Sequence, residues 1–119
     1  MRDFHHLDIW QRSHQLTLRI YSVTQTFPKE EVFGLASQMR RSASSVPTNI
    51  AEGCGRDSSI ELKRFLTIAS GSISELQYQV ILCKDLNYIN ETLYKELFDE
   101  ISQIRKMIYS YSFKLKADC

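Results

Sequence analysis

The sequence predicts an all-α protein in which four helices form an antiparallel up-down-up-down bundle, within a single domain of residues 1–119. Apolar residues recur three and four positions apart along four long segments, and no segment shows the alternation of a β-strand. The chain contains only two prolines and four glycines, which favours long uninterrupted helices. The connections between the segments are short, and short connections place consecutive helices side by side in opposite directions.

The first helix is predicted to begin at Asp8, because Asp8 and Gln11 have the spacing of a capping box. It is predicted to end where Phe27 precedes Pro28, since the residue before a proline disfavours helical backbone angles. The stripe expected to face the core contains Ile9, Ser13, Leu16, Ile20, Val23 and Phe27.

A second helix is predicted to begin within residues 29–32, where two glutamates suit the positive end of the helix dipole. Gly53 and Gly55 are predicted to end it. Its inner stripe is expected to contain Leu35, Met39, Ser42, Val46 and Ile50.

Pro47 lies in the middle of this second helix and predicts a kink there. A proline removes one backbone donor and presses against the carbonyl four residues earlier, here that of Ala43, at a cost of about 3 kcal/mol. Small residues occupy positions 42–45. We expect them to let a neighbouring helix approach closely at Gly71 and Ser72, and we expect serine hydroxyls to bind the freed carbonyls.

Ser58 and Glu61 form another capping box and predict the start of a third helix, which ends at the turn of residues 85–90. Asn90 is predicted to cap a fourth helix. The inner stripe of the third helix is expected to contain Leu62, Phe65, Ala69, Ser72 or Ile73, Leu76, Val80 and Cys83. The stripe of the fourth is expected to contain Leu93, Leu97, Ile101, Ile104, Ile108, Tyr111 and Leu115.

The most specific signal lies in the second and third segments. It consists of FPKEEVFGLASQMRRSASSVPTNIAEGCGR at residues 27–56 and LKRFLTIASGSISEL at residues 62–76. On these runs, and on an almost continuous match from Leu7 to Ile108, the chain resembles the 23S rRNA intervening-sequence proteins. It departs from the family pattern at Leu62, where the family carries an aromatic residue.

The resemblance implies a four-helix bundle that assembles into a ring-shaped homopentamer. It also implies an association with RNA or DNA, because the genes of the family were first noticed within insertions in large-subunit ribosomal RNA genes. A related branch, the accessory proteins of diversity-generating retroelements, is basic and is associated with nucleic acid and a reverse transcriptase. The motif positions that carry over, none with an established catalytic role, are Gln38, Arg40, Arg41, Ser45, Pro47, Asn49, Glu52, Gly53 and Arg56.

Arginines near two predicted helix ends are the candidate nucleic-acid contacts. They are Arg40, Arg41, Arg56 and Arg64. We expect the fold to bring them together, so that their charges bind phosphates without reading base sequence. The alternative is that nearby acids such as Glu52 and Glu61 neutralise them, since residues 28–64 carry six basic and five acidic residues. Assembly of several copies would strengthen a modest patch through avidity.

The sequence contains no residue pattern that predicts catalysis, a cofactor or a metal site. His5 and His6 are adjacent and therefore face different directions on a helix, and His14 has no carboxylate one helical turn further along the chain. An enzyme whose site forms between subunits remains an alternative. Its residues would be Asn49, Glu52 and Cys54.

The cysteines and the N-terminus bear on the cellular location. Cys54, Cys83 and Cys119 are odd in number and lack the spacing of a zinc site, so we expect free thiols in a reducing compartment. The N-terminal residues lack the apolar stretch of a signal peptide, and no apolar run approaches the roughly 20 residues of a membrane span. We therefore expect a cytoplasmic protein with no membrane partner.

Aromatic residues outside the inner stripes favour self-association, because a small bundle cannot bury all of them and exposed apolar surface often marks an interface. These residues are Trp10, Tyr21, Phe33, Tyr78, Tyr88, Tyr94, Phe98, Tyr109 and Phe113. The favoured interpretation is a non-enzymatic homo-oligomer that associates with RNA through the arginines. The alternative is a scaffold that holds a protein partner without nucleic-acid contact, which a net charge of only +1 favours.

Overall fold

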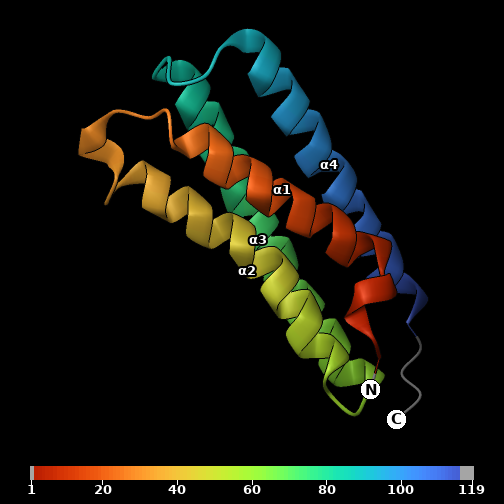
Figure 1. Ribbon diagram of the computed structural model, residues 1–119. Coiled ribbons are helices and arrows are strands. Elements are labelled where there is room, and N and C mark those ends of the chain that lie inside the picture. The colour runs from red at the N-terminus through yellow and green to blue at the C-terminus, as the bar shows by residue number, and fades with distance from the viewer. Residues whose placement is uncertain (1, 116–119) are drawn as a thin grey trace.

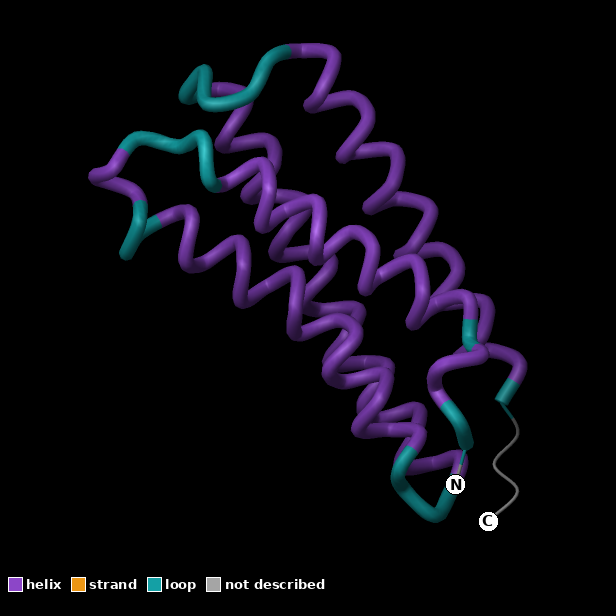
Figure 2. Tube along the Cα trace, viewed as in Figure 1, coloured by secondary structure: helices purple, strands orange, loops and turns teal. Residues whose placement is uncertain are grey.

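Four long helices account for most of residues 2–115, the part of the chain that the computed structural model describes (Figures 1 and 2). They are α1 (Asp8–Thr24), α2 (Leu35–Cys54), α3 (Ser59–Asp85) and α4 (Glu91–Lys114). Two 3-10 turns, η1 (Phe4–His6) and η2 (Lys29–Glu31), precede α1 and α2. The described residues contain no β-strand, and the predicted all-α fold with four helices is confirmed.

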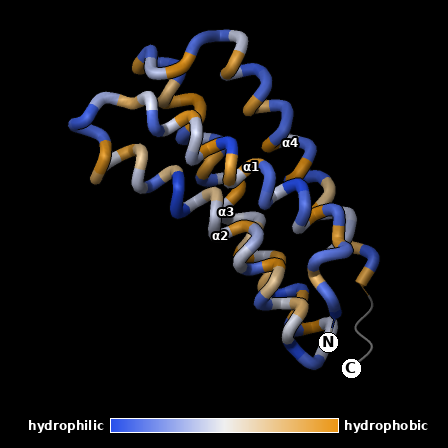
Figure 3. The backbone as a smooth tube through the Cα atoms, in the orientation of Figure 1, coloured by the Kyte–Doolittle hydropathy of each residue, from blue (hydrophilic) through white to orange (hydrophobic). Residues whose placement is uncertain are grey.

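Each helix packs against two others around a shared core. α2 contacts α1 and α3, and α4 contacts α3 and α1. The connections of α1 to α2 and of α3 to α4 lie at one end of the molecule, whereas the connection of α2 to α3 lies at the other (Figure 1). The molecule is elongated, with extents of 48 × 24 × 20 Å. Hydrophobic and hydrophilic residues alternate along each helix of the trace (Figure 3).

The predicted stripes form this core. Every stripe residue assigned to α1 and α2 is buried, including Ser13 and Ser42. In α3 the choice between Ser72 and Ile73 is decided, because Ile73 is fully buried and Ser72 is partly exposed. In α4 the middle of the stripe is buried, whereas Leu93 at the beginning of the helix is partly buried. Full burial of such aliphatic side chains stabilises a fold by about 1.5–3 kcal/mol each.

α1 begins at Asp8, as predicted, but the predicted capping box is absent. Asp8 is the first residue of the helix rather than its cap, and Leu7 precedes it without a side-chain hydrogen bond. The side-chain amide of Gln11 instead donates to the backbone carbonyl oxygen of His5 at 2.8 Å. The capping side chain is that of Asp3, which accepts from the His5 amide at 3.0 Å and starts η1. The helix ends at Thr24, before the predicted end at Phe27.

The start of α2 also differs from the prediction, because η2 is a separate turn and α2 begins only at Leu35. Glu31 nevertheless caps α2, although it lies outside the helix. Its carboxylate accepts hydrogen bonds from the backbone amide of Leu35 at 3.0 Å and from the Tyr88 hydroxyl at 2.8 Å. These two hydrogen bonds lower the pKa of Glu31. The other two predicted caps are confirmed: Ser58 accepts from the amide of Glu61, and Asn90 accepts from that of Leu93.

Candidate functional site

Pro47 lies inside α2, and the carbonyl that it deprives of a partner is bound from another helix. The Thr17 hydroxyl of α1 lies 3.0 Å from the Ala43 carbonyl oxygen and 2.8 Å from the Ser13 carbonyl oxygen. The Ser13 oxygen already has a partner within α1, whereas the Ala43 oxygen has lost its own to the proline. The prediction that a serine would bind the freed carbonyl is therefore wrong, because a buried threonine across the α1–α2 contact does so.

A second polar contact joins α2 to α3 two residues before the proline. The Ser72 hydroxyl donates to the Ser45 hydroxyl at 2.8 Å, and the Asn49 amide donates to the carbonyl and hydroxyl oxygens of Ser45 at 2.8 and 3.0 Å. The expected approach of a neighbouring helix at Ser72 is thus observed. Gly71 was expected to share it, but the space around its α-carbon is open.

α2 and α3 are in close contact at Gly53. A β-carbon at this position would lie 2.7 Å from Leu62 Cδ1 and 2.9 Å from Phe65 Cβ, which is closer than carbon atoms pack. Gly53 therefore has a packing role within the motif. Leu62, the position at which the chain departs from the family pattern, forms part of this contact.

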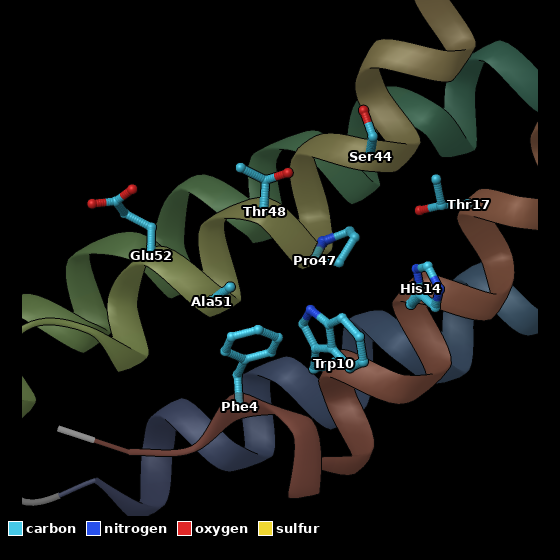
Figure 4. Close-up of a pocket in the computed structure, with 9 residues that line it drawn as sticks. All are labelled: Phe4, Trp10, His14, Thr17, Ser44, Pro47, Thr48, Ala51 and Glu52. Carbon is cyan, nitrogen blue, oxygen red and sulfur yellow. The ribbon is translucent and has the colours of Figure 1, made fainter.

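A groove of about 590 Å³ runs between α1 and α2 over this region (Figure 4). Phe4, Trp10 and His14 form one wall, with the Trp10 and His14 rings stacked at 5.0 Å between centroids. Pro47 and Ala51 lie opposite these rings in Figure 4. The groove thus sets an aromatic wall against a face of α2 that presents Pro47 and Ala51 together with the polar side chains of Ser44, Thr48 and Glu52. In Figure 4 the Glu52 carboxylate points away from His14, so the acid and the imidazole do not form a pair.

A second groove, of about 540 Å³, lies on the other side of α2 and is lined only by polar and charged residues of α2 and α3. Arg41 and Glu75 are its charged residues, and both are exposed. Ser45 and Ser72 meet within it. Arg41 and Ser45, two residues of the family motif, therefore line the same groove as Ser72 and Glu75 of α3.

Arg40 connects α2 to α1. Its Nε donates to the Thr24 hydroxyl at 2.8 Å and its Nη2 donates to the Tyr21 carbonyl oxygen at 3.2 Å. The guanidinium carbon lies 4.8 Å from the centroid of the Tyr21 ring. These contacts give Arg40 a structural role at the end of α1.

Arg56 and Arg64 lie together over one aromatic ring. Their guanidinium carbons are 4.8 and 4.7 Å from the centroid of the Phe65 ring. Each also pairs with an acid one turn away, Arg56 with Glu52 at 2.9 Å and Arg64 with Glu61 at 3.2 Å. The carboxylate of Glu61 has a lowered pKa because Arg64 donates to it. Nearby acids therefore pair with these two arginines, as the alternative in the sequence analysis proposed.

The structure does not gather the four candidate arginines into one patch. Arg40 lies in the first half of α2 and Arg56 follows its last turn, and the intervening helix spans about 21 Å at 1.5 Å per residue. Arg40 contacts α1, Arg41 lines the groove with α3, and Arg56 shares Phe65 with Arg64. The expectation that all four arginines would meet is therefore wrong. Arg40, Arg41 and Arg56 belong to one continuous motif, but α2 places its members far apart and on different sides of the helix.

The cysteines of the described residues are inert. Cys54 and Cys83 are both buried free thiols. Burial raises the pKa of the Cys54 thiol, and burial with a smaller effect from Glu31 raises that of Cys83 to about 12. A buried thiol that stays protonated is a poor nucleophile, which contradicts a reactive role for Cys54. Cys119 lies outside the described residues.

The histidines form no metal site. Within residues 2–115 there is no group of three or more metal-ligating side chains. His5 and His6 instead flank Asp3, with nitrogen-to-oxygen distances of 2.8 and 3.3 Å. His14 stacks on Trp10.

Several large apolar side chains are exposed. Phe33 is 97% exposed in the connection before α2, and Phe113 and Tyr109 are 76% and 69% exposed near the end of α4. Tyr78 of α3 is also exposed. Trp10, Tyr88, Tyr94 and Phe98, which were expected to lie partly off the stripes, are partly buried.

Three features were not anticipated, namely the Thr17 hydroxyl, the Glu31–Tyr88 contact and the position of Phe65 beneath two guanidinium groups. Only the last had a sequence signal, since Arg64 adjoins Phe65 in the sequence. No helix among the described residues is long and apolar enough to cross a membrane.

Comparison with known proteins gives one family. No curated protein matches the chain. A crystal structure of a protein of unknown function from the S23 ribosomal protein family of Bacteroides thetaiotaomicron has the same fold, with a TM-score of 0.81 and 23% identity. The similarity covers 87% of this chain and 97% of that one. The model of the 23S rRNA-intervening sequence protein family matches residues 5–110. The resemblance seen in the sequence is therefore confirmed, and the chain belongs to the 23S rRNA-intervening sequence protein family.

Proposed function

We propose that this protein is a non-enzymatic, oligomeric helical-bundle protein of the cytoplasm that associates with RNA through exposed arginines. Neither the family model nor the similar crystal structure names an enzymatic activity. The buried thiols and the histidine contacts described above also favour a binding function over catalysis.

The observation that carries the proposal is the pair of guanidinium groups over Phe65. Both guanidinium carbons lie close to the same ring, at 4.8 Å for Arg56 and 4.7 Å for Arg64, so two exposed cationic groups are held near each other by one aromatic side chain. Their ion pairs with Glu52 and Glu61 are exposed, and such pairs contribute only about 0–1 kcal/mol. Phosphate oxygens can replace those carboxylates at little cost, because arginine binds phosphate in the same two-pronged geometry.

Assembly is the second part of the proposal. Phe33, Tyr109 and Phe113 expose apolar surface that a second copy of the chain would cover. In a ring of five copies, the number that the family resemblance leads us to expect, the Arg56–Arg64 pair would occur five times. Repeated weak contacts gain strength by avidity, which compensates for the small net charge of +1.

The test combines light scattering with RNA titration on the nuclease-treated protein. We expect five times the mass of one chain, and binding of a labelled structured RNA that weakens steeply with salt. The double variant Arg56→Gln/Arg64→Gln should weaken binding and reduce its salt dependence. The matched control Lys95→Gln/Lys106→Gln removes two exposed charges from α4 and should change binding less. Equal effects of the two variants would contradict the assignment.

A scaffold that holds a protein partner is the second candidate, and the 97% exposure of Phe33 favours it. This candidate predicts capture of a protein partner that survives nuclease treatment and high salt. It also predicts that Phe33→Ser abolishes capture of the partner. The wild type should then show no binding of RNA at either low or moderate salt.

A further inference from the structure

The groove between α2 and α3 differs from the rest of the α2–α3 contact in having no apolar lining residue. Gln38, Arg41, Ser44 and Thr48 line it from α2, and Ser72 and Glu75 line it from α3. Its volume of about 540 Å³ is within the range of small-molecule sites, and its polar lining suits a polar ligand.

The two charged residues of this groove are available to a ligand. Arg41 and Glu75 are both exposed, and the ion pairs among the described residues include neither of them. Arg41 differs in this respect from Arg40, Arg56 and Arg64, whose guanidinium groups all have protein partners. The groove therefore presents one guanidinium and one carboxylate on opposite walls.

The floor between these walls is fixed. The Ser45 hydroxyl accepts hydrogen bonds from Ser72 at 2.8 Å and from Asn49 at 3.0 Å. Glu75 has one contact beneath it, the amide of the buried Gln79 at 3.5 Å. The hydroxyls between the two charged residues are therefore fixed before a ligand binds, whereas the Arg41 side chain is ordered by the ligand itself.

The combination of charges selects among ligands. A purely anionic group would be attracted by Arg41 and repelled by Glu75. A cation would be repelled by Arg41 and attracted by Glu75. A ligand that carries an anion next to a hydroxyl donor satisfies both, because a carboxylate accepts a hydrogen bond from a hydroxyl. The sugar–phosphate unit of RNA has this chemistry, whereas DNA lacks the 2′-hydroxyl.

We infer that the α2–α3 groove binds a ribose–phosphate unit of an RNA chain, with Arg41 donating to a phosphate and Glu75 accepting from the 2′-hydroxyl. This inference rests on the proposed association with RNA and names the residues that distinguish RNA from DNA. The Arg56–Arg64 pair then supplies charge without distinguishing the two nucleic acids.

The test compares short single-stranded RNA and DNA of the same base sequence by fluorescence anisotropy, with wild type, Arg41→Gln and Glu75→Ala. Controls are Lys106→Gln and Asp99→Ala, which remove exposed charges of the same signs from α4. We expect wild type to prefer RNA. Arg41→Gln should lower affinity for both strands by about tenfold, the value of one charge-assisted hydrogen bond.

The decisive variant is Glu75→Ala, which removes the hydrogen-bond acceptor and should bring the RNA-to-DNA affinity ratio close to one. The ratio is the readout because removing an acidic charge also strengthens binding of any polyanion. An unchanged ratio, together with an Arg41→Gln effect no larger than that of Lys106→Gln, would overturn the groove assignment and leave the RNA association standing. Absence of any RNA binding by wild type would overturn both.

A free ribonucleoside 5′-monophosphate has the same chemistry as a ribose–phosphate unit of RNA and serves as a competitor. Displacement of the RNA only at a large excess of the nucleotide supports an RNA chain as the occupant. Equal affinity of the nucleotide and the oligonucleotide would overturn that part of the inference.

Discussion

The hydroxyl of Thr17 in α1 lies 3.0 Å from the carbonyl oxygen of Ala43 in α2, the oxygen that Pro47 leaves without its usual helical partner. This contact explains how the chain accommodates a proline in the middle of a buried helix. Thr17 and Ala43 are both buried, so water does not replace the missing donor. The contact also fixes the position of α1 against α2 beside the aromatic groove.

We predict that Thr17→Val destabilises the protein by about 1–3 kcal/mol, because valine keeps the shape and leaves a buried carbonyl without a donor. Urea unfolding measures the change. Thr67→Val is the matched control, since the Thr67 hydroxyl binds a carbonyl of its own helix at an exposed position. Pro47→Ala restores the backbone donor to Ala43, so Thr17→Val should cost clearly less in that background. Additive effects of the two changes would contradict the proposed link.

The second prediction concerns two glycines that lie inside helices. Gly53→Ala should destabilise the protein by about 1–3 kcal/mol, because the new methyl group overlaps Leu62 and Phe65. Gly71→Ala should instead stabilise it by about 0.5–1 kcal/mol, since nothing lies near the new methyl group and alanine favours a helix. Thermal unfolding of both variants checks the opposite signs. A similar effect at both positions would show that helix propensity rather than packing decides.

The third prediction follows from the buried thiols. In the variant Cys119→Ser, a thiol reagent at neutral pH should label Cys54 and Cys83 only after unfolding, because both are buried and remain protonated. The pKa of Cys83 is about 12 in the folded protein, against 9.0 for an ordinary thiol. Between these values unfolding releases a proton, so stability should fall as the pH rises through this range. Cys83→Ala should reduce that dependence, and rapid labelling of the native protein would contradict the burial.

The fourth prediction concerns the acid side of the stability curve. The pKa of Glu31 is lowered because its carboxylate accepts the Leu35 amide and the Tyr88 hydroxyl. The stability that this carboxylate contributes is present above its unfolded pKa, near 4.5, and is lost as the pH falls through the lower folded pKa. Glu31→Gln should therefore flatten the loss of stability in acid, as measured by urea unfolding at a series of pH values. Glu30→Gln, next to it in η2, is the control and should leave the curve unchanged.

The four helices and most of the residues that face the core could be predicted from local sequence patterns. Spacings of three and four are a local property of a helix, so the stripes from Leu35 to Ile50 and from Leu97 to Ile108 could be read directly. The caps at Ser58 and Asn90 were equally local, since each side chain binds an amide three residues away. The family was also recoverable, because its motif is one continuous run of residues.

Which residues act together depends on how the four helices pack against one another. Thr17 and Ala43 are 26 positions apart, and Arg56 and Arg64 meet through the ring of Phe65. Arg40 and Arg41 are neighbours in sequence, yet one binds α1 and the other lines a groove with α3. Consecutive residues of a helix point about 100° apart, so contacts depend on which helices flank them. That arrangement is set by packing across the whole core, which periodicity along one segment does not encode.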